Sequence, residues 1–283
     1  MVLEEHEWRA RAAAHRTRVE RWTLPHRERR RRGETHPVLD FLFTYYSLRP
    51  ARLEQWHPGP DVLLLGGDDL LGVPGHVRDG AGVRLDVGAL PDRTARTAAF
   101  VHDLLVATAA RPARLSCFGL HEWAMVYRTD APRHAQVPLR LGAAGTDAVV
   151  ESLPVHCTHH DAFRFFTEAA RPLNALQPER AQQVANEQPG CLHATMDLYK
   201  WAYKLGPATP SELLADCFAL AVEVRELDMR ASPYDLADLG YPPVPVETPA
   251  GRAEYARAQA AFARRAAPLR ARLIELCARI ISD

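Results

Sequence analysis

Residues 191–205 read CLHATMDLYKWAYKL, and this stretch predicts a helix with two contrasting faces. At spacings of four, three and four residues, one face carries His193, Asp197, Lys200 and Lys204. The opposite face suits a protein core, because it carries Leu192, Met196, Tyr199, Tyr203 and Leu205. In an arginine-rich chain, a plainly exposed face would be expected to carry Arg and Glu. The polar face is therefore either a functional site or an exposed ladder of i, i+4 pairs.

Helical periodicity continues on both sides of this segment. We expect helices at residues 4–31, 36–56, 92–110, 116–127, 156–170, 178–186, 190–205, 211–230 and 250–281. Two stretches, 57–91 and 137–150, are expected to hold short strands between Gly and Pro residues, and the proline-rich stretch 231–250 is expected to be coil. The sequence thus predicts a single, mainly α-helical domain over residues 1–283 with a small β insertion.

Composition narrows the classes of function. The 35 basic and 35 acidic residues cancel, so binding to DNA would need a local arginine patch such as residues 27–32. That basic run is better explained as the solvated face of a helix. The five cysteines are far apart and form no C-x-x-C pair, which favours a reducing compartment. The sequence has no apolar leader and no run of 18 apolar residues, so we expect a cytoplasmic protein that does not bind membranes.

Two lysines and three histidines are the most informative polar residues. Lys200 and Lys204 are the only lysines in the sequence, which hints at a role for a titratable amine. In the segment VHCTHHD, residues 155–161, the three histidines would share one arc of a helix. His156, His159 and His160 could then bind a metal ion, bind phosphate or simply pack.

Several acidic residues are further candidates for the site. Glu187 comes just before the His193 helix, where the helix dipole stabilises a negative charge, and it is either a ligand or base or part of an entry turn. His121-Glu122 could face the same pocket or the surface. In the helix expected at 211–230, Asp216 and Glu223 are candidates for a buried acidic site or for ion pairs with arginine.

Two segments carry a family resemblance: HPVLDFLFTYY, residues 36–46, and EQPGCLH, residues 187–193. They resemble a family of actinobacterial proteins labelled 3-methyladenine DNA glycosylase, and the likeness extends over most of the chain. The resemblance implies a DNA-repair hydrolase, without a cofactor, that cleaves the N-glycosidic bond of an alkylated base after flipping it out of the duplex. No helix-hairpin-helix motif is recognisable, so the resemblance assigns no individual residue.

Three functions are therefore weighed for the polar residues. For the glycosylase, the expected catalytic residues are His193, Asp197, Lys200 and Glu187, and the expected substrate-binding residues are Trp201, Tyr203 and Lys204. The first alternative is a helical enzyme that uses iron or manganese on a small molecule, with ligands drawn from His156, His159, His160, Glu187, His193 and Asp197. The second alternative is a non-catalytic protein that binds an anion. The metal hypothesis requires that the His156 and His193 segments face each other.

Overall fold

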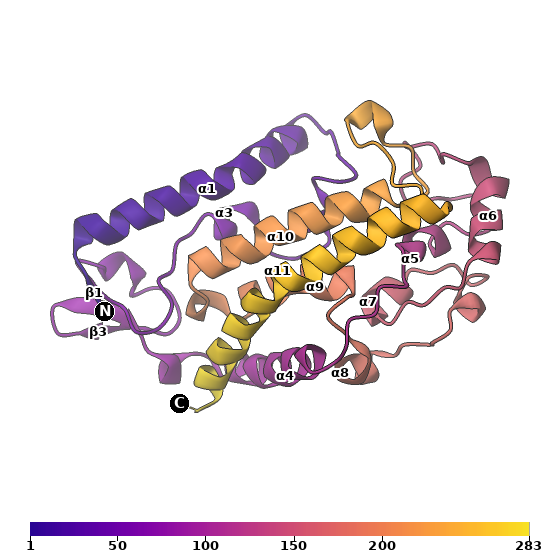
Figure 1. Cartoon of the computed structure of the whole chain (residues 1–283). Helices are drawn as coiled ribbons and strands as arrows, with labels where there is room; N and C mark the ends of the chain where they lie inside the picture. Colours follow the sequence, from indigo (N-terminus) through magenta and orange to yellow (C-terminus); the bar gives the residue numbers. More distant parts are fainter. Residues whose placement is uncertain (283) are drawn as a thin grey trace. The chain divides into compact units, whose positions relative to one another are not determined.

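The computed structural model describes residues 1–282 and confirms a mainly α-helical chain with a small β-sheet (Figure 1). The chain divides into two compact units. The first comprises Met1–Leu105, Asp197–Ala221 and Pro268–Asp283, and the second comprises Val106–Met196 and Val222–Ala267. Four helices contribute residues to both units: α4 (Asp92–Ala109), α9 (Leu192–Lys204), α10 (Ser211–Arg230) and α11 (Pro249–Ser282). Along residues 1–282, no helix is both long enough and apolar enough to span a bilayer.

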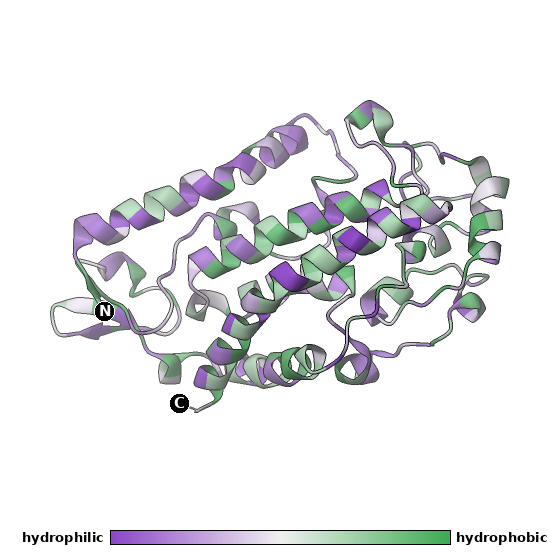
Figure 2. Ribbon diagram, viewed as in Figure 1, coloured by the Kyte–Doolittle hydropathy of each residue, from purple (hydrophilic) through white to green (hydrophobic). Residues whose placement is uncertain are grey.

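The first unit is built on the long N-terminal helix α1 (Glu5–Arg31). A capping box begins it, in which the Glu4 backbone N–H donates to the Glu7 carboxylate at 2.9 Å. One side of α1 is buried, through Trp8, His15, Val19, Thr23 and His26. Most of the rest of α1 is hydrophilic, as Figure 2 shows. An amphipathic helix of this kind packs by a single stripe, and its arginines remain at the surface.

A four-stranded sheet lies at the beginning of α1 (Figure 1). Its strands are β1 (Val2–Leu3), β2 (Leu63–Leu65), β3 (His76–Asp79) and β4 (Gly82–Leu85), in the order β1-β2-β4-β3. The β1 and β2 strands are parallel, and the other neighbours are antiparallel. The Trp8 indole N–H donates to the Leu65 carbonyl at 2.9 Å, which fastens α1 to the sheet. The unit also contains the 3-10 helices η1 (Asp68–Leu70), η2 (Val87–Ala89) and η5 (Gly206–Ala208).

The prediction of a single helix over residues 36–56 is wrong. Two short helices, α2 (Phe41–Thr44) and α3 (Pro50–Leu53), replace it. The Asp40 carboxylate accepts a hydrogen bond from the His36 backbone N–H at 2.8 Å, which closes a turn before α2. Pro50 begins α3, because proline fits the first turn of a helix but not its interior.

The second unit surrounds its core with shorter elements. Its own helices are α5 (Leu120–Ala124), α6 (Gly142–Ser152), α7 (His160–Phe163) and α8 (Gln183–Asn186), with the 3-10 helices η3 (Arg171–Leu173), η4 (Arg180–Gln182) and η6 (Ala237–Leu239). Trp123 and Tyr255 are fully buried in this core. The Trp123 indole N–H donates to the Ala231 carbonyl at 2.8 Å, so the largest core side chain also satisfies its polar atom.

Three predictions fail in the second unit. The helix expected at 156–170 is reduced to α7, because Val155 pairs with Asn174 and the Asn174 amide bonds both backbone groups of Cys157. The helix expected at 178–186 is split between η4 and α8. In the stretch 137–150, the strand is reduced to one bridge from Leu139 to Tyr234, and the helix α6 forms beside it. In the first and third of these segments, contacts with residues further along the chain override weak helical or strand periodicity.

The proline-rich segment 231–250 closes onto the first turn of α11. A Cβ atom on Gly251 would lie 1.9 Å from the Pro245 carbonyl oxygen. The Thr248 hydroxyl donates to the same carbonyl at 2.9 Å and accepts from the Gly251 backbone N–H at 3.0 Å. Only a residue without a side chain therefore allows this close approach.

We expect Gly251→Ala to lower the free energy of unfolding by about 1–3 kcal/mol, because the new methyl group overlaps the Pro245 backbone. The same change inside an unobstructed helix raises stability by about 1 kcal/mol. Gly72→Ala is the control, since a Cβ there meets no atom within 4 Å. Urea denaturation measures both variants, and equal stabilities would contradict the close contact.

Candidate metal centre

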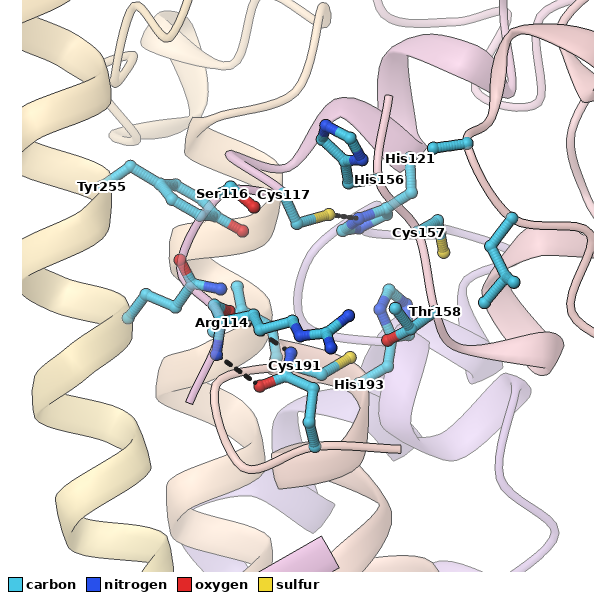
Figure 3. Close-up of a pocket in the computed structure, with 15 residues that line it drawn as sticks. Arg114, Ser116, Cys117, His121, His156, Cys157, Thr158, Cys191, His193 and Tyr255 are labelled. Atoms are coloured by element: carbon cyan, nitrogen blue, oxygen red, sulfur yellow. Dashed lines mark hydrogen bonds between the residues drawn. The ribbon is translucent and has the colours of Figure 1, made fainter. Parts of the chain in front are cut away.

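The second unit contains a cavity of about 410 Å³. This volume lies within the range of small-molecule sites. Its wall combines histidines, cysteines and amides from separate segments of the chain (Figure 3). The lining residues are Arg114, Ser116, Cys117, His121, His156, Cys157, Thr158, Ala175, Leu176, Gln188, Cys191, Leu192, His193, Tyr255 and Gln259.

A tight turn positions Cys117 and His121 in this wall. Phe118 and Gly119 both have positive φ angles, of 48° and 72°. Left-handed geometry is unfavourable for Phe118, and such backbone strain is concentrated at functional sites. The turn brings the Cys117 Sγ within 3.5 Å of the His121 Nδ1.

His121 is joined to a buried carboxylate on α10. Its Nε2 lies 2.8 Å from the Asp228 Oδ1, and both residues are almost completely buried. The other oxygen of Asp228 accepts from the Arg225 guanidinium at 3.0 Å, and Arg225 also donates to Glu122 at 2.8 Å. Each buried charge in this network is therefore matched by an opposite one.

The two partners shift each other's pKa in opposite directions. Burial alone would lower the pKa of His121, but the charge of Asp228 and the hydrogen bond to it raise that pKa well above its usual value. Burial would raise the pKa of Asp228, but His121, His193 and Arg225 together hold it well below the ordinary range. The carboxylate is thus ionised at every physiological pH.

His193 joins the cluster from the first turn of α9. Its ring centroid lies 4.5 Å from that of His121, and 5.3 Å from that of His159, on which it stacks. The His159 Nε2 is in turn 3.3 Å from the Glu187 Oε1. The Glu187 carboxylate is oriented by a hydrogen bond that it accepts from the Gln183 amide at 2.5 Å. Three imidazoles and two carboxylates are therefore gathered in one buried cluster.

Three of these atoms are placed to bind a single ion. Ligand atoms of His121, His193 and Asp228 lie within 4.8 Å of one another. Because metal–ligand bonds are about 2.0–2.2 Å long, small side-chain movements and release of the proton between His121 and Asp228 would let one ion contact all three. Arg225 and Cys117 contact the outer atoms of Asp228 and His121, and such contacts orient metal ligands.

The segment with three histidines does not form the single helical arc that was expected, and its members diverge. Only His159 enters the buried cluster. His156 lies in the extended stretch before α7, is exposed and lines the cavity. His160 points elsewhere, with its Nδ1 3.0 Å from the Pro178 carbonyl. The required proximity of this segment to His193 is nevertheless present.

The remaining predicted residues belong to the first unit. Asp197 is buried and accepts from the Tyr46 hydroxyl and from the Lys200 ammonium, both at 2.9 Å. Burial, followed by the charge of Asp197, raises the pKa of Tyr46 well above its usual value. The ammonium groups of Lys200 and Lys204 lie 4.6 and 5.8 Å from the ring centroid of Trp201.

Trp201 and Tyr203, which were predicted to bind substrate, contact other residues of the first unit. Trp201 packs edge-on against Phe100, and the Tyr203 hydroxyl lies 3.3 Å from the Ser47 hydroxyl. Along α9, exposure increases from the buried His193 and Asp197 to the exposed Lys204. The polar face is therefore not an exposed ladder throughout.

The sequence did not single out several residues of the cluster. Cys117, Asp228 and Tyr255 were not proposed as site residues, and His121 was only a weak candidate. Asp216 and Glu223, the other acids considered on α10, form ion pairs with arginine, as one of the two alternatives predicted, and their partners are Arg18 and Arg265. A usable signal was the i, i+3 pair of Arg225 and Asp228 on a helix rich in apolar residues, because such a pair is suited to burial.

Comparison of the chain with protein-family models, curated proteins and solved structures finds no match. The comparisons therefore give neither support nor opposition to the glycosylase resemblance. The interpretation of the site depends on its own chemistry.

We expect Asp228→Asn to lower the free energy of unfolding by about 3–5 kcal/mol, because it leaves His121 without its buried counter-charge and removes one of the two carboxylates that pair with Arg225. Glu223→Gln is the control on the same helix, and its exposed pair with Arg265 contributes at most about 1 kcal/mol. Chemical denaturation of both variants provides the comparison. Similar losses would show that the Asp228 network is not a principal source of stability.

Proposed function

We propose that this chain is a metal-dependent enzyme in which His121, His193 and Asp228 bind one ferrous iron or manganese ion beside the cavity. The observation that carries the proposal is a buried set of two imidazoles that line a cavity of small-molecule size and one carboxylate that contacts them from outside the lining. This donor set is typical of non-haem iron centres that keep open coordination positions.

The arrangement of the three residues favours access from the cavity. His121 and His193 belong to the cavity lining, whereas Asp228 lies behind them and is held by Arg225. With the three side chains placed in this way, the side of the ion that faces the cavity would remain available to a substrate. A bound ion would supply Lewis-acid or redox chemistry to that substrate.

His159 and Glu187 add a second function to the cluster. Their atoms approach to 3.3 Å, and the His159 ring stacks on His193. An imidazole beside a carboxylate can accept, hold and return a proton. We therefore assign proton transfer to this pair and substrate orientation to the cavity wall.

The first prediction concerns metal content. We expect purified protein to contain stoichiometric iron or manganese, and His193→Gln to lose it, because a ligand to the ion is removed. His160→Gln is the matched control, since that ring contacts the Pro178 carbonyl and is not part of the cavity lining. Elemental analysis by mass spectrometry measures all three proteins.

If the His193→Gln variant folds poorly, a second measurement on the wild-type protein tests the same proposal. Chelator-treated wild-type protein should gain thermal stability when ferrous iron or manganese is added, because an ion that binds only the folded state stabilises it. Metal-free protein that shows no such gain with iron, manganese or zinc would contradict the proposal.

Release of an alkylated base from DNA, implied by the family resemblance, stays a prediction. Its candidate acid, Asp197, is bonded to Tyr46 and Lys200 in the first unit. The reaction needs no metal, so base release by chelator-treated protein, lost in Asp197→Asn, would favour the glycosylase over the metalloenzyme.

A further inference from the structure

The cavity wall holds two buried polar atoms that the metal centre does not use. The Tyr255 hydroxyl and the Gln259 Oε1 have no hydrogen-bond partner among residues 1–282, although both side chains are at least 99% buried. They are four residues apart on α11, and therefore neighbours on one face of the helix. The Gln259 Nε2 donates to the Gly190 carbonyl at 2.6 Å, which identifies the oxygen as the unused atom. Unsatisfied buried polar atoms are costly, and a cavity that displays two of them is suited to a ligand.

These two atoms define one polar group of that ligand. Burial, followed by the charges of nearby groups, raises the pKa of Tyr255 well above its usual value, so its hydroxyl stays protonated and can donate. The Gln259 oxygen can only accept. A hydroxyl or amide group of a ligand would satisfy both, since it accepts from the Tyr255 hydroxyl and donates to the Gln259 oxygen.

Arg114 supplies a positive charge to the cavity wall. Among the described residues that line the cavity, it has the one guanidinium or ammonium group, and none of them is Asp or Glu. Gln188 fixes its backbone, accepting from the Arg114 N–H at 2.8 Å and donating to the Arg114 carbonyl at 3.3 Å. No carboxylate of residues 1–282 forms an ion pair with the Arg114 side chain. Figure 3 shows Arg114 between Tyr255 on one side and His193 on the other.

We propose that the cavity binds a small organic carboxylate that carries a hydroxyl or amide group. Its carboxylate pairs with Arg114, and its neutral group bonds the Tyr255 hydroxyl and the Gln259 oxygen. The identification of this ligand as the substrate depends on the proposed metal centre, because His121 and His193 form the facing wall (Figure 3). Binding itself does not depend on the metal.

The lining favours a monoanion with a carbon skeleton over a phosphorylated compound. A single guanidinium matches one carboxylate in charge and in its paired hydrogen bonds. A phosphate monoester carries close to two negative charges at neutral pH, for which this wall offers less compensation. Ala175, Leu176 and Leu192 contribute apolar surface for the skeleton.

The test uses the full chain and matched sets of small aromatic and aliphatic compounds. Each set contains a carboxylate with a hydroxyl or amide group, its methyl ester, its analogue without the hydroxyl or amide, and the corresponding phosphate. Ligand-observed NMR detects binding, and calorimetry measures the dissociation constants. We expect the complete carboxylates to bind tightest within their sets.

Two variants locate the contacts. Arg114→Gln should weaken binding of the best carboxylate at least about tenfold, because a charged hydrogen bond is lost. Tyr255→Phe should weaken it about two- to tenfold and should reduce the advantage over the analogue that lacks the donor. Arg180→Gln, which changes an exposed arginine outside the cavity lining, is the control and should bind like the wild type.

Each outcome separates this inference from the proposed function. It is overturned if no carboxylate binds, if esters or phosphates bind better, or if Arg114→Gln binds the carboxylate as the wild type does. Metal content should be unchanged in both variants. Carboxylate binding that depends on Arg114 in a protein without metal would uphold the ligand site and remove the metal centre. Stoichiometric metal without carboxylate binding would do the reverse.

Discussion

The buried carboxylate of Asp228 is the constraint on which the second unit depends. A carboxylate removed from water requires compensation on each of its oxygens, and here His121 meets one and Arg225 the other. Arg225 in turn needs Glu122, which lies next to His121 on α5. The need to balance one charge thus joins α5 to α10 and fixes the histidine that faces the cavity. Stability and chemical capability come from the same contacts.

The cluster is assembled from four separate stretches of sequence. Residues 117–122, 157–159, 187–193 and 225–228 each supply part of it. The stretches are held mainly by backbone and amide bonds, such as those of Asn174 to Cys157 and of Gln188 to Arg114. Because these hydrogen bonds fix the backbone of each stretch, the imidazoles are oriented before any ligand arrives. Preorganisation of this kind lowers the cost of binding.

The sequence predicted long elements well and short ones poorly. The periodicity of α1, α10 and α11 extends over many turns, so their ends were placed within one or two residues. The region around His156 failed because Asn174, a residue distant in sequence, holds its backbone extended. His159, Glu187 and His193 were found because their types are unusual in those positions. Asp228 was missed because α10 carries several acids, and periodicity does not show which one meets a histidine from another helix.

The contact between Gly251 and Pro245 has a consequence for the evolution of ligand choice. Tyr255 is one turn, about 6 Å, further along the same helix. The contact of the proline-rich coil with Gly251 therefore affects where Tyr255 lies along the helix axis in the cavity wall. Residues of the coil can therefore alter the depth of the cavity without touching its contents. Selectivity for the ligand that we propose would then be open to adjustment from a distance, through the length and composition of a coil that does not line the cavity.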